Sequence, residues 1–168
     1  SRVGTGPLPT ELGGVEGQTP AYEPGSAPDD EEELASWIRD EGGEYGTVTG
    51  RPRRVGWLDM PMLRHAARTS GFTGIVVNHV DTLAGLDEVA VGHTYTMTTR
   101  DGDTVERDVM PPTTEQWGRC EATLRTFEGW PDVDWDAVAA EGWEGLPAAA
   151  RTYLTYIEDE LDVPIYAV

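Results

Sequence analysis

Hydrophobic side chains recur every three or four positions in three stretches of the chain, which is the spacing of an α-helix with one buried face. An aspartate that can accept hydrogen bonds from the first backbone N–H groups precedes two of them. Asp29 or Asp30 would cap the first helix, and Asp59 would cap the second. We therefore predict helices over residues 30–41, 60–70 and Leu146–Leu161.

The apolar residues of each predicted helix define the face expected to pack on the core. Acidic residues crowd the first turn of the first helix, where they complement the helix dipole. Pro61 and Pro147 lie near the starts of the other two, where proline is tolerated, and Gly71 ends the second. The inward-facing residues are expected to be Leu34, Trp37 and Ile38, then Met62, Leu63, Ala66 and Ala67, then Leu154, Ile157 and Leu161.

Other apolar runs lack helical spacing and predict strands. Thr73–Asn78 contains a continuous apolar run, which is typical of a strand buried on both faces of a parallel sheet. Glu88–Thr98 and Thr104–Val109 alternate between apolar and polar positions, and Asp101-Gly102 between them is a strong hairpin signal. We expect further strands at Arg119–Phe127 and Val163–Val168, and short helical segments at 113–118 and Asp134–Ala140.

These elements predict an α/β fold with a mostly parallel central sheet, flanking helices and an antiparallel hairpin. The length of 168 residues favours one domain. Residues 1–13 contain too much Gly and Pro for a helix interior and are expected to form a strand end that continues into an ordered loop. Residues 14–28 are polar and expected to be exposed.

The charge balance narrows the possible partners. The chain carries 31 acidic and 12 basic residues, has no lysine, and has a formal net charge of −19. Such a charge argues against binding to nucleic acid or an anionic membrane. Six Trp and six Tyr argue against an acidic disordered protein. The combination of high acidity with ordinary apolar segments suggests adaptation to a salt-rich cytosol, where ions screen the repulsion.

Cysteine usage and hydropathy suggest a cytoplasmic protein. The single cysteine, Cys120, excludes an internal disulfide, and we expect it to be an inert, partly buried thiol. The sequence shows no signal peptide and no apolar run long enough to cross a bilayer. It begins without methionine and stops inside a predicted strand, so we expect a fragment of a larger protein.

Positive charge gathers in one stretch, Gly42–Trp57. Arg51, Arg53 and Arg54 lie there among several glycines and two threonines. Glycines allow a backbone to approach a ligand closely, and guanidinium groups bind carboxylate or phosphate in bidentate fashion. The stretch therefore predicts an anion-binding loop. The alternative is a mobile loop whose arginines only offset the surrounding negative charge.

Four segments, in chain order, match the motifs of one known family. Gly43–Trp57 reads Gly-Glu-Tyr-Gly-Thr-Val-Thr-Gly-Arg-Pro-Arg-Arg-Val-Gly-Trp, and Arg2–Leu12 reads Arg-Val-Gly-Thr-Gly-Pro-Leu-Pro-Thr-Glu-Leu. Gly74–Glu88 and Leu146–Ile165 supply the other matches. On these residues the chain resembles adenylosuccinate synthetase, which implies a P-loop-type GTP-dependent synthetase fold and a homodimer.

The resemblance also implies a ligase of de novo AMP biosynthesis that joins L-aspartate to IMP. GTP phosphorylates the 6-oxygen of IMP, and the aspartate amino group then displaces that phosphate, with the assistance of Mg²⁺. By position in the motif, Arg51 also contacts IMP and Arg53 also reaches GTP. The aspartate-binding residues implied by the motif are Thr47, Val48, Thr49, Gly50, Arg51, Pro52 and Arg53.

Some positions depart from the family motif or match it less clearly. Val48 stands where the family has threonine, so a hydroxyl is lost while the backbone donors remain. Arg54 is a second-rank candidate, because its motif position is less clearly a ligand contact. The resemblance places Val3 and Gly4 at the nucleotide through backbone atoms.

His79, Val80 and Asp81 fall where the family carries its guanine-recognition motif. One carboxylate can accept hydrogen bonds from both N1–H and the 2-amino group of guanine, so Asp81 favours GTP over ATP. His79 replaces the lysine of the family and carries less charge at neutral pH. The alternative for Asp81 is the N-cap of a helical turn that begins at Thr82.

The chain lacks several groups that the resemblance requires. It contains no Gly-x-x-x-x-Gly-Lys run, so we expect the phosphate loop, the catalytic aspartate and histidine and the Mg²⁺ ligands in a missing N-terminal half. The last guanine-contacting segment is also expected to be missing. Residues 1–168 would then be the C-terminal part of the synthetase domain, with no catalytic or metal-binding residues of their own.

Two alternatives stay open at this stage. One is a phage-type relative that acts on dGMP with ATP, and the other is a non-catalytic nucleotide-binding fragment. His65 and His93 have no motif support and are expected to have structural surroundings, and we assign the tryptophans mostly to packing.

Overall fold

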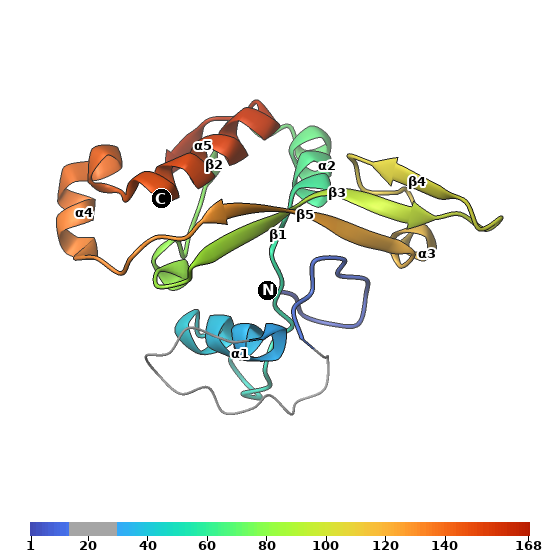
Figure 1. Ribbon diagram of the computed structural model, residues 1–168, viewed down its shortest axis with the longest axis horizontal. Coiled ribbons are helices and arrows are strands. Elements are labelled where there is room, and N and C mark those ends of the chain that lie inside the picture. The colour runs from blue at the N-terminus through green and yellow to red at the C-terminus, as the bar shows by residue number, and fades with distance from the viewer. Residues whose placement is uncertain (14–29) are drawn as a thin grey trace.

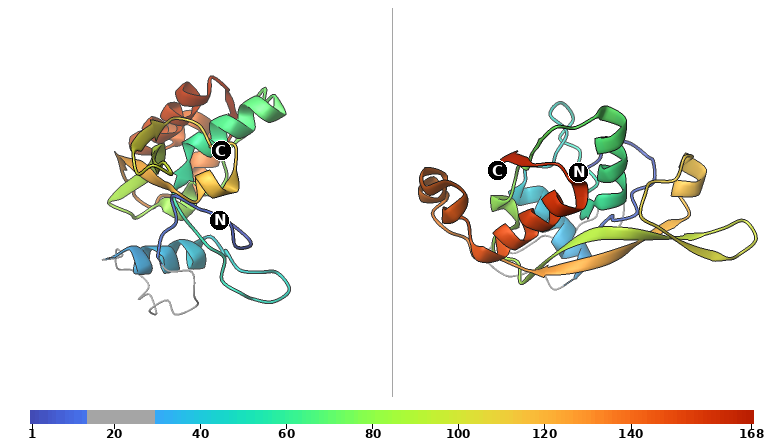
Figure 2. Two further views of the ribbon diagram at one scale, coloured as in Figure 1. Left: turned by 90° about the vertical axis from the view of Figure 1, so that its right-hand side faces the viewer. Right: turned by 90° about the horizontal axis from the view of Figure 1, so that it is seen from above.

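A computed structural model describes residues 1–13 and 30–168. The expectation that residues 14–28 are exposed, and the possible cap at Asp29, lie outside the described residues. Figure 1 shows a long pair of strands across the middle of the molecule, with helices above and below it. Figure 2 gives the same arrangement from the side and from above.

The larger sheet is built on β3 (Glu88–Thr98), which has a partner on each edge. β5 (Cys120–Glu128) pairs antiparallel with it along nearly its full length, with a register shift between Gly92 and Thr94. The opposite edge pairs antiparallel with β4 (Thr104–Arg107) and parallel with β1 (Leu58–Asp59). The hairpin predicted around Asp101-Gly102 is confirmed.

A second, two-stranded sheet joins β2 (Ile75–Val76) in parallel with β6 (Ile165–Ala167). The α/β class is confirmed, with parallel pairs, an antiparallel hairpin and flanking helices in the described chain. The prediction that Thr73–Asn78 is buried on both faces is wrong, because the side chain of Val76 is 57% exposed. No described segment covers that side of the short β2, so its apolar run is only half enclosed.

Local capping chemistry sets the starts of the first two helices. Asp30 precedes α1 (Glu31–Glu41), and its carboxylate accepts hydrogen bonds from the N–H groups of Glu32 and Glu33. Asp59 caps α2 (Met60–Ser70), which ends at Gly71 in the left-handed conformation. Both predicted helices are confirmed.

The prediction that Met62 of α2 faces inward is wrong. Met62 is exposed, whereas Met60 is fully buried. Met60, Leu63 and Ala67 are spaced three and four residues apart, so they share the inner face, and Met62 lies on another side of the helix.

The remaining elements are η1 (Asp81–Leu83), α3 (Thr114–Trp117), α4 (Trp135–Glu141), η2 (Gly142–Gly145) and α5 (Ala148–Leu161). The helices α3, α4 and α5 lie close to their predicted positions, whereas no element was predicted at η2. The main core lies where α5 and α2 pack on β3 and β5, with Leu154, Ile157 and Trp130 almost fully buried. A smaller cluster of Leu12, Ala35 and Val55 packs α1 against the chain on either side of it. This cluster fixes the base of the arginine-rich loop.

Candidate functional site

The arginine-rich stretch forms a hairpin-like loop that projects from the body between α1 and β1 (Figure 2, left). The N–H of Gly46 donates to the carbonyl of Arg51 at 2.8 Å, and the N–H of Arg53 donates to Glu44 at 2.9 Å. The N–H of Gly50 donates back to Gly46 at 2.7 Å and closes the tip. The tip residues Thr47–Gly50 are exposed, and the side chain of Val48 is 96% exposed.

Two residues of α1 hold the base of this loop. The side chain of Arg39 is buried, and its Nε donates to the carbonyl of Arg53 at 2.8 Å. The N–H of Glu44 donates to the carbonyl of Arg39 at 2.8 Å. The hydroxyl of Tyr45 donates to Asp40, and this hydrogen bond raises the pKa of Tyr45. The loop is therefore anchored at its base, while its tip carries the exposed donors.

The three loop arginines have different surroundings. Arg51 is exposed, and its guanidinium has no hydrogen-bond or ion-pair partner among the residues that the structure describes. Arg53 forms an ion pair with Glu44, with 2.9 Å between Nη1 and Oε2. Arg54 is largely buried against Glu11, and this charged hydrogen bond raises its pKa. Arg51 is therefore the freest of the three to bind an anion.

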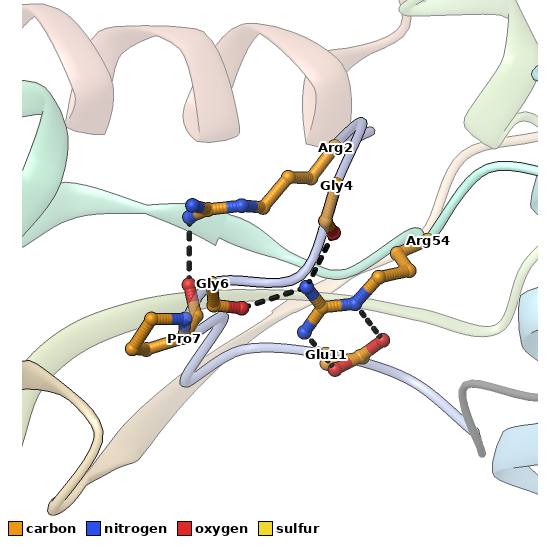
Figure 3. A network of polar contacts seen from close by, with 6 residues as sticks. All are labelled: Arg2, Gly4, Gly6, Pro7, Glu11 and Arg54. Atoms are coloured by element: carbon orange, nitrogen blue, oxygen red, sulfur yellow. Dashed lines mark hydrogen bonds and ion pairs between the residues drawn. The ribbon is translucent and has the colours of Figure 1, made fainter. Parts of the chain in front are cut away.

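Arg54 faces the N-terminal segment instead of solvent (Figure 3). Its Nη1 donates to the carbonyl oxygens of Gly4 and Gly6 at 3.0 and 2.7 Å. Val3, which the resemblance placed at the nucleotide, is exposed beside this contact. Gly4 adopts a φ of 92°, which favours glycine. Sequence reasoning did not find this arrangement, because Glu11 lies 43 positions from Arg54.

His79, Val80 and Asp81, which the resemblance assigns to a guanine-recognition motif, follow β2 and lead into the short turn η1, which begins at Asp81. The buried Val80 accepts a hydrogen bond from Nε1 of Trp130 at 3.0 Å, which fixes the backbone before Asp81. The carboxylate of Asp81 makes no capping hydrogen bond to η1, so the alternative role of Asp81 as an N-cap is wrong. Asp81 is exposed, and its carboxylate can therefore face a ligand.

His79 occupies a strained backbone position next to this carboxylate. Its φ is 64°, in the left-handed region, which a residue with a side chain adopts at some cost. Its Nδ1 lies 3.2 Å from the hydroxyl of Thr82. That hydroxyl can orient the imidazole ring at the mouth of the adjoining cleft.

A cleft of about 610 Å³ opens beside the motif. Its largely apolar walls come from α4, η2 and β6, and Asp81 and His79 lie at its edge. Flat apolar walls beside one carboxylate suit a planar base that presents N–H groups at its rim. The sequence analysis missed these walls because it assigned the tryptophans to packing, although Trp143 is 40% exposed. The wall side chains include Trp135, Val138, Trp143, Leu146, Ile165 and Tyr166.

The loop and the guanine-recognition motif are adjacent. A Cβ built on Gly42, at the base of the loop, would lie 3.5 Å from the methyl group of Thr82 and 2.8 Å from the carbonyl oxygen of Ile38. The end of α1 therefore packs directly on η1. This contact joins the base of the loop to the turn that begins at Asp81, about forty positions later in the sequence.

The other titratable candidates have structural surroundings. Nδ1 of His93 lies 2.6 Å from the hydroxyl of Tyr156, and Cys120 is a buried free thiol whose pKa is raised by burial. Within residues 1–13 and 30–168, no group of three or more His, Cys, Asp or Glu side chains could hold a metal ion. None of the described helices is long and apolar enough to span a bilayer.

Comparisons with known proteins bear on the family to which this chain belongs. The family model described as adenylosuccinate synthetase matches residues 1–168. Adenylosuccinate synthetases from Natronomonas pharaonis and Haloarcula marismortui are 71% and 64% identical over 168 residues, which is all of this chain and 35% of each relative. The chain thus spans about a third of the length of these curated relatives.

A solved structure of a fully ligated adenylosuccinate synthetase from Plasmodium falciparum is also similar. It superposes with a TM-score of 0.75 at 30% identity, covering 98% of this chain and 34% of that one. On the match to the family model and the similarity of sequence and fold, the chain belongs to the adenylosuccinate synthetase family.

Proposed function

We propose that this chain supplies the aspartate loop and the guanine-binding elements of an enzyme that ligates L-aspartate to IMP with GTP. The observation that carries the proposal is that the base of the loop with the free Arg51 packs on the turn whose exposed Asp81 lines a largely apolar cleft. A dicarboxylate nucleophile and a phosphorylated purine are both anions, so guanidinium groups and backbone donors can hold and align them.

In the loop, the tip residues Thr47–Gly50 and Pro52 would close over aspartate, with backbone N–H groups donating to its carboxylates. Arg51 would bind aspartate and the phosphorylated IMP, since its guanidinium has no competing partner in the described chain. Arg53 would contact aspartate and extend toward GTP, while its ion pair with Glu44 holds the stem of its side chain. Val48 would contribute only its backbone.

In the cleft, the carboxylate of Asp81 would accept hydrogen bonds from N1–H and the 2-amino group of guanine. Val80 would hold the backbone in place through its bond with Trp130, and His79 would stack along the base. Adenine offers no such pair of donors, so the free carboxylate favours GTP. This reasoning disfavours the ATP-dependent, dGMP-specific alternative.

The resemblance adds Mg²⁺, a homodimer and a cytoplasmic location to the proposal. As the resemblance implies, the ligands for Mg²⁺ would come from another part of the protein. Bound there, the ion would neutralise phosphate charge. The residues of this chain would bind and orient the reactants.

Two substitutions in the full-length enzyme test the loop. Arg51→Leu should weaken the use of IMP and Arg53→Leu the use of aspartate, each by about 2–5 kcal/mol in kcat/KM, if closure of the loop over the ligand desolvates the charge pair that each arginine makes with it. Arg68→Leu is the matched control, since Arg68 is exposed on the last turn of α2. Steady-state constants that stay at the wild-type values in both loop variants would refute the assignment.

The cleft is tested by nucleotide competition. Asp81→Asn should raise KM for GTP by about tenfold or more, because it replaces a charged acceptor of two hydrogen bonds, and it should reduce the preference for GTP over ATP. Asp87→Asn, at an exposed aspartate before β3, is the control. An unchanged GTP:ATP preference in the Asp81→Asn variant would contradict the proposed role of Asp81.

A further inference from the structure

Arg54 makes an unusually complete set of hydrogen bonds within the chain (Figure 3). Its Nε and Nη2 donate to the two carboxylate oxygens of Glu11 at 2.7 and 2.6 Å. Its Nη1 donates to the carbonyls of Gly4 and Gly6. Four of its five N–H donors are therefore used, and the side chains of Arg54 and Glu11 are only 14% and 18% exposed. A guanidinium bound in this way is not available to a substrate.

The segment that Arg54 holds has no regular secondary structure of its own. The carbonyls of Gly4 and Gly6 accept hydrogen bonds from Arg54. In addition, the N–H of Arg2 donates to the carbonyl of Arg54 at 2.7 Å. Nη1 of Arg2 donates to the carbonyl of Pro7 at 2.7 Å, and its guanidinium lies over the ring of Trp117. The shape of residues 2–7 thus depends on contacts with two arginines, and Arg54 connects it to the loop.

The direction of these bonds decides what the segment presents to its surroundings. The carbonyl of Gly4 points toward Arg54, so the N–H of Thr5, on the opposite side of the same trans peptide, points away from it. The side chain of Val3 is 81% exposed. On the side of the loop, Arg54 directly follows Arg53 in the chain, so no residue separates the contact from the loop arginines.

We propose that Arg54 and Glu11 form a positioning pair, which sets the distance between the segment of residues 3–6 and the arginine-rich loop. The inference rests on the proposed function, in which the loop binds aspartate, and on the resemblance, which places Val3 and Gly4 at the purine nucleotide. The pair then aligns the two reactants, and neither residue touches them. The planar guanidinium group of Arg54 is essential, because a lysine ammonium cannot bind both oxygens of Glu11 and two carbonyls in these directions.

The test uses the full-length enzyme with Glu11→Gln, Arg54→Lys, the double variant and the control Arg68→Lys. Misalignment of bound reactants lowers kcat, so each single variant should lose about 10- to 100-fold in kcat with KM for IMP and aspartate changed by less than about threefold. The double variant should be no worse than either single one, because both remove the same connection.

Three kinetic outcomes would overturn the proposal. A lower Tm with unchanged kcat and KM would leave Arg54 and Glu11 as a structural ion pair only. A large rise in KM for Arg54→Lys, with none for Glu11→Gln, would mean that Arg54 binds a substrate directly. Additive losses in the double variant would mean that the two residues act separately.

A measurement without turnover separates this inference from the proposed function. In the ligand-free protein, Glu11→Gln should speed exchange of the hydrogen-bonded amides of Arg2 and Leu12 in the N-terminal segment and of Arg53 in the loop, and Arg68→Lys should not. If the unaltered enzyme forms no adenylosuccinate, the proposed function fails. If it does, and exchange in both segments stays at the wild-type rate in Glu11→Gln, the positioning pair fails alone.

Discussion

A buried carboxylate at the start of α2 makes a sharp prediction about stability and pH. Asp59 is 3% exposed, and the fully buried hydroxyl of Tyr95 lies 2.6 Å from each of its oxygens. Nε1 of Trp117 donates to the same hydroxyl at 3.1 Å. The N–H of Met62 donates to Asp59 at 3.0 Å. The substitution Tyr95→Phe removes only the oxygen at the centre of this network.

The cost can be estimated from the bonds that this oxygen makes. A hydrogen bond to a charged group contributes about 1.5–3 kcal/mol, and a buried indole N–H left without an acceptor costs about 1–3 kcal/mol. Part of this cost is recovered by local relaxation. We expect Tyr95→Phe to lower the free energy of unfolding by roughly 2–4 kcal/mol near neutral pH.

The pKa of Asp59 determines how this cost varies with pH. Burial raises the pKa of Asp59, and the hydrogen bonds from Tyr95 and Met62 oppose that rise. A carboxyl group with a raised folded-state pKa favours the folded state below its unfolded pKa, and this stabilisation is lost as pH rises through the folded pKa. Tyr95→Phe removes one opposing hydrogen bond and so raises the folded pKa further. Its cost should therefore be larger at neutral pH than in acid.

Urea titration followed by tryptophan fluorescence, in high salt at about pH 4 and about pH 7, measures both costs. The comparison of variants at one pH cancels the contribution of the remaining acidic groups. Asp59→Asn is the control background, because it keeps an acceptor for the N–H of Met62 and does not titrate. In that background the cost of Tyr95→Phe should not depend on pH. An equal cost at both pH values with Asp59 present would refute the reasoning.

Three further predictions follow from features of the chain. Residues 1–168 alone should give no turnover with IMP, GTP, Mg²⁺ and aspartate, since the chain has no lysine for a phosphate loop; detectable adenylosuccinate would contradict this. The midpoint temperature of thermal unfolding should rise as KCl is added, because salt screens the net charge of −19; a midpoint independent of salt would count against adaptation to salt. Iodoacetamide should modify Cys120 slowly in the folded chain and quickly in urea, because burial raises the pKa of its thiol; equal rates would show that the thiol is accessible.

The parts of the fold that sequence predicted well depend on neighbouring residues. The caps at Asp30 and Asp59 act on N–H groups two or three positions away, so the sequence alone indicates them. The alternation of Glu88–Thr98 predicted a strand correctly, but it did not report two different faces, because consecutive side chains of β3 are buried. The burial of Thr73–Asn78 was predicted wrongly, because burial depends on what covers a strand and not on its own composition.

In the candidate site too, the sequence indicated what depends on neighbouring residues and not what depends on contacts between distant ones. Motif positions identified the loop and the guanine-recognition motif, but they could not show that Arg54 is bound by Glu11 while Arg51 is free. Nor could they show that Trp143 lines a cleft, since an aromatic residue in a sequence fits a core and a ligand pocket equally well. The structure shows that the carboxylate of Asp81 caps no helical turn, while its contact with guanine stays a prediction.

Gly43 and Gly50, on the two sides of the loop tip, have φ values of 59° and 64°. A Cβ built on either glycine would meet no atom within 4 Å. Substitution to alanine there would therefore be resisted by backbone torsion alone, at about 1 kcal/mol for each position, with no clash to transmit into the core. The identity of the residue at these two positions is therefore set by the turn of the loop itself and not by packing against the rest of the fold.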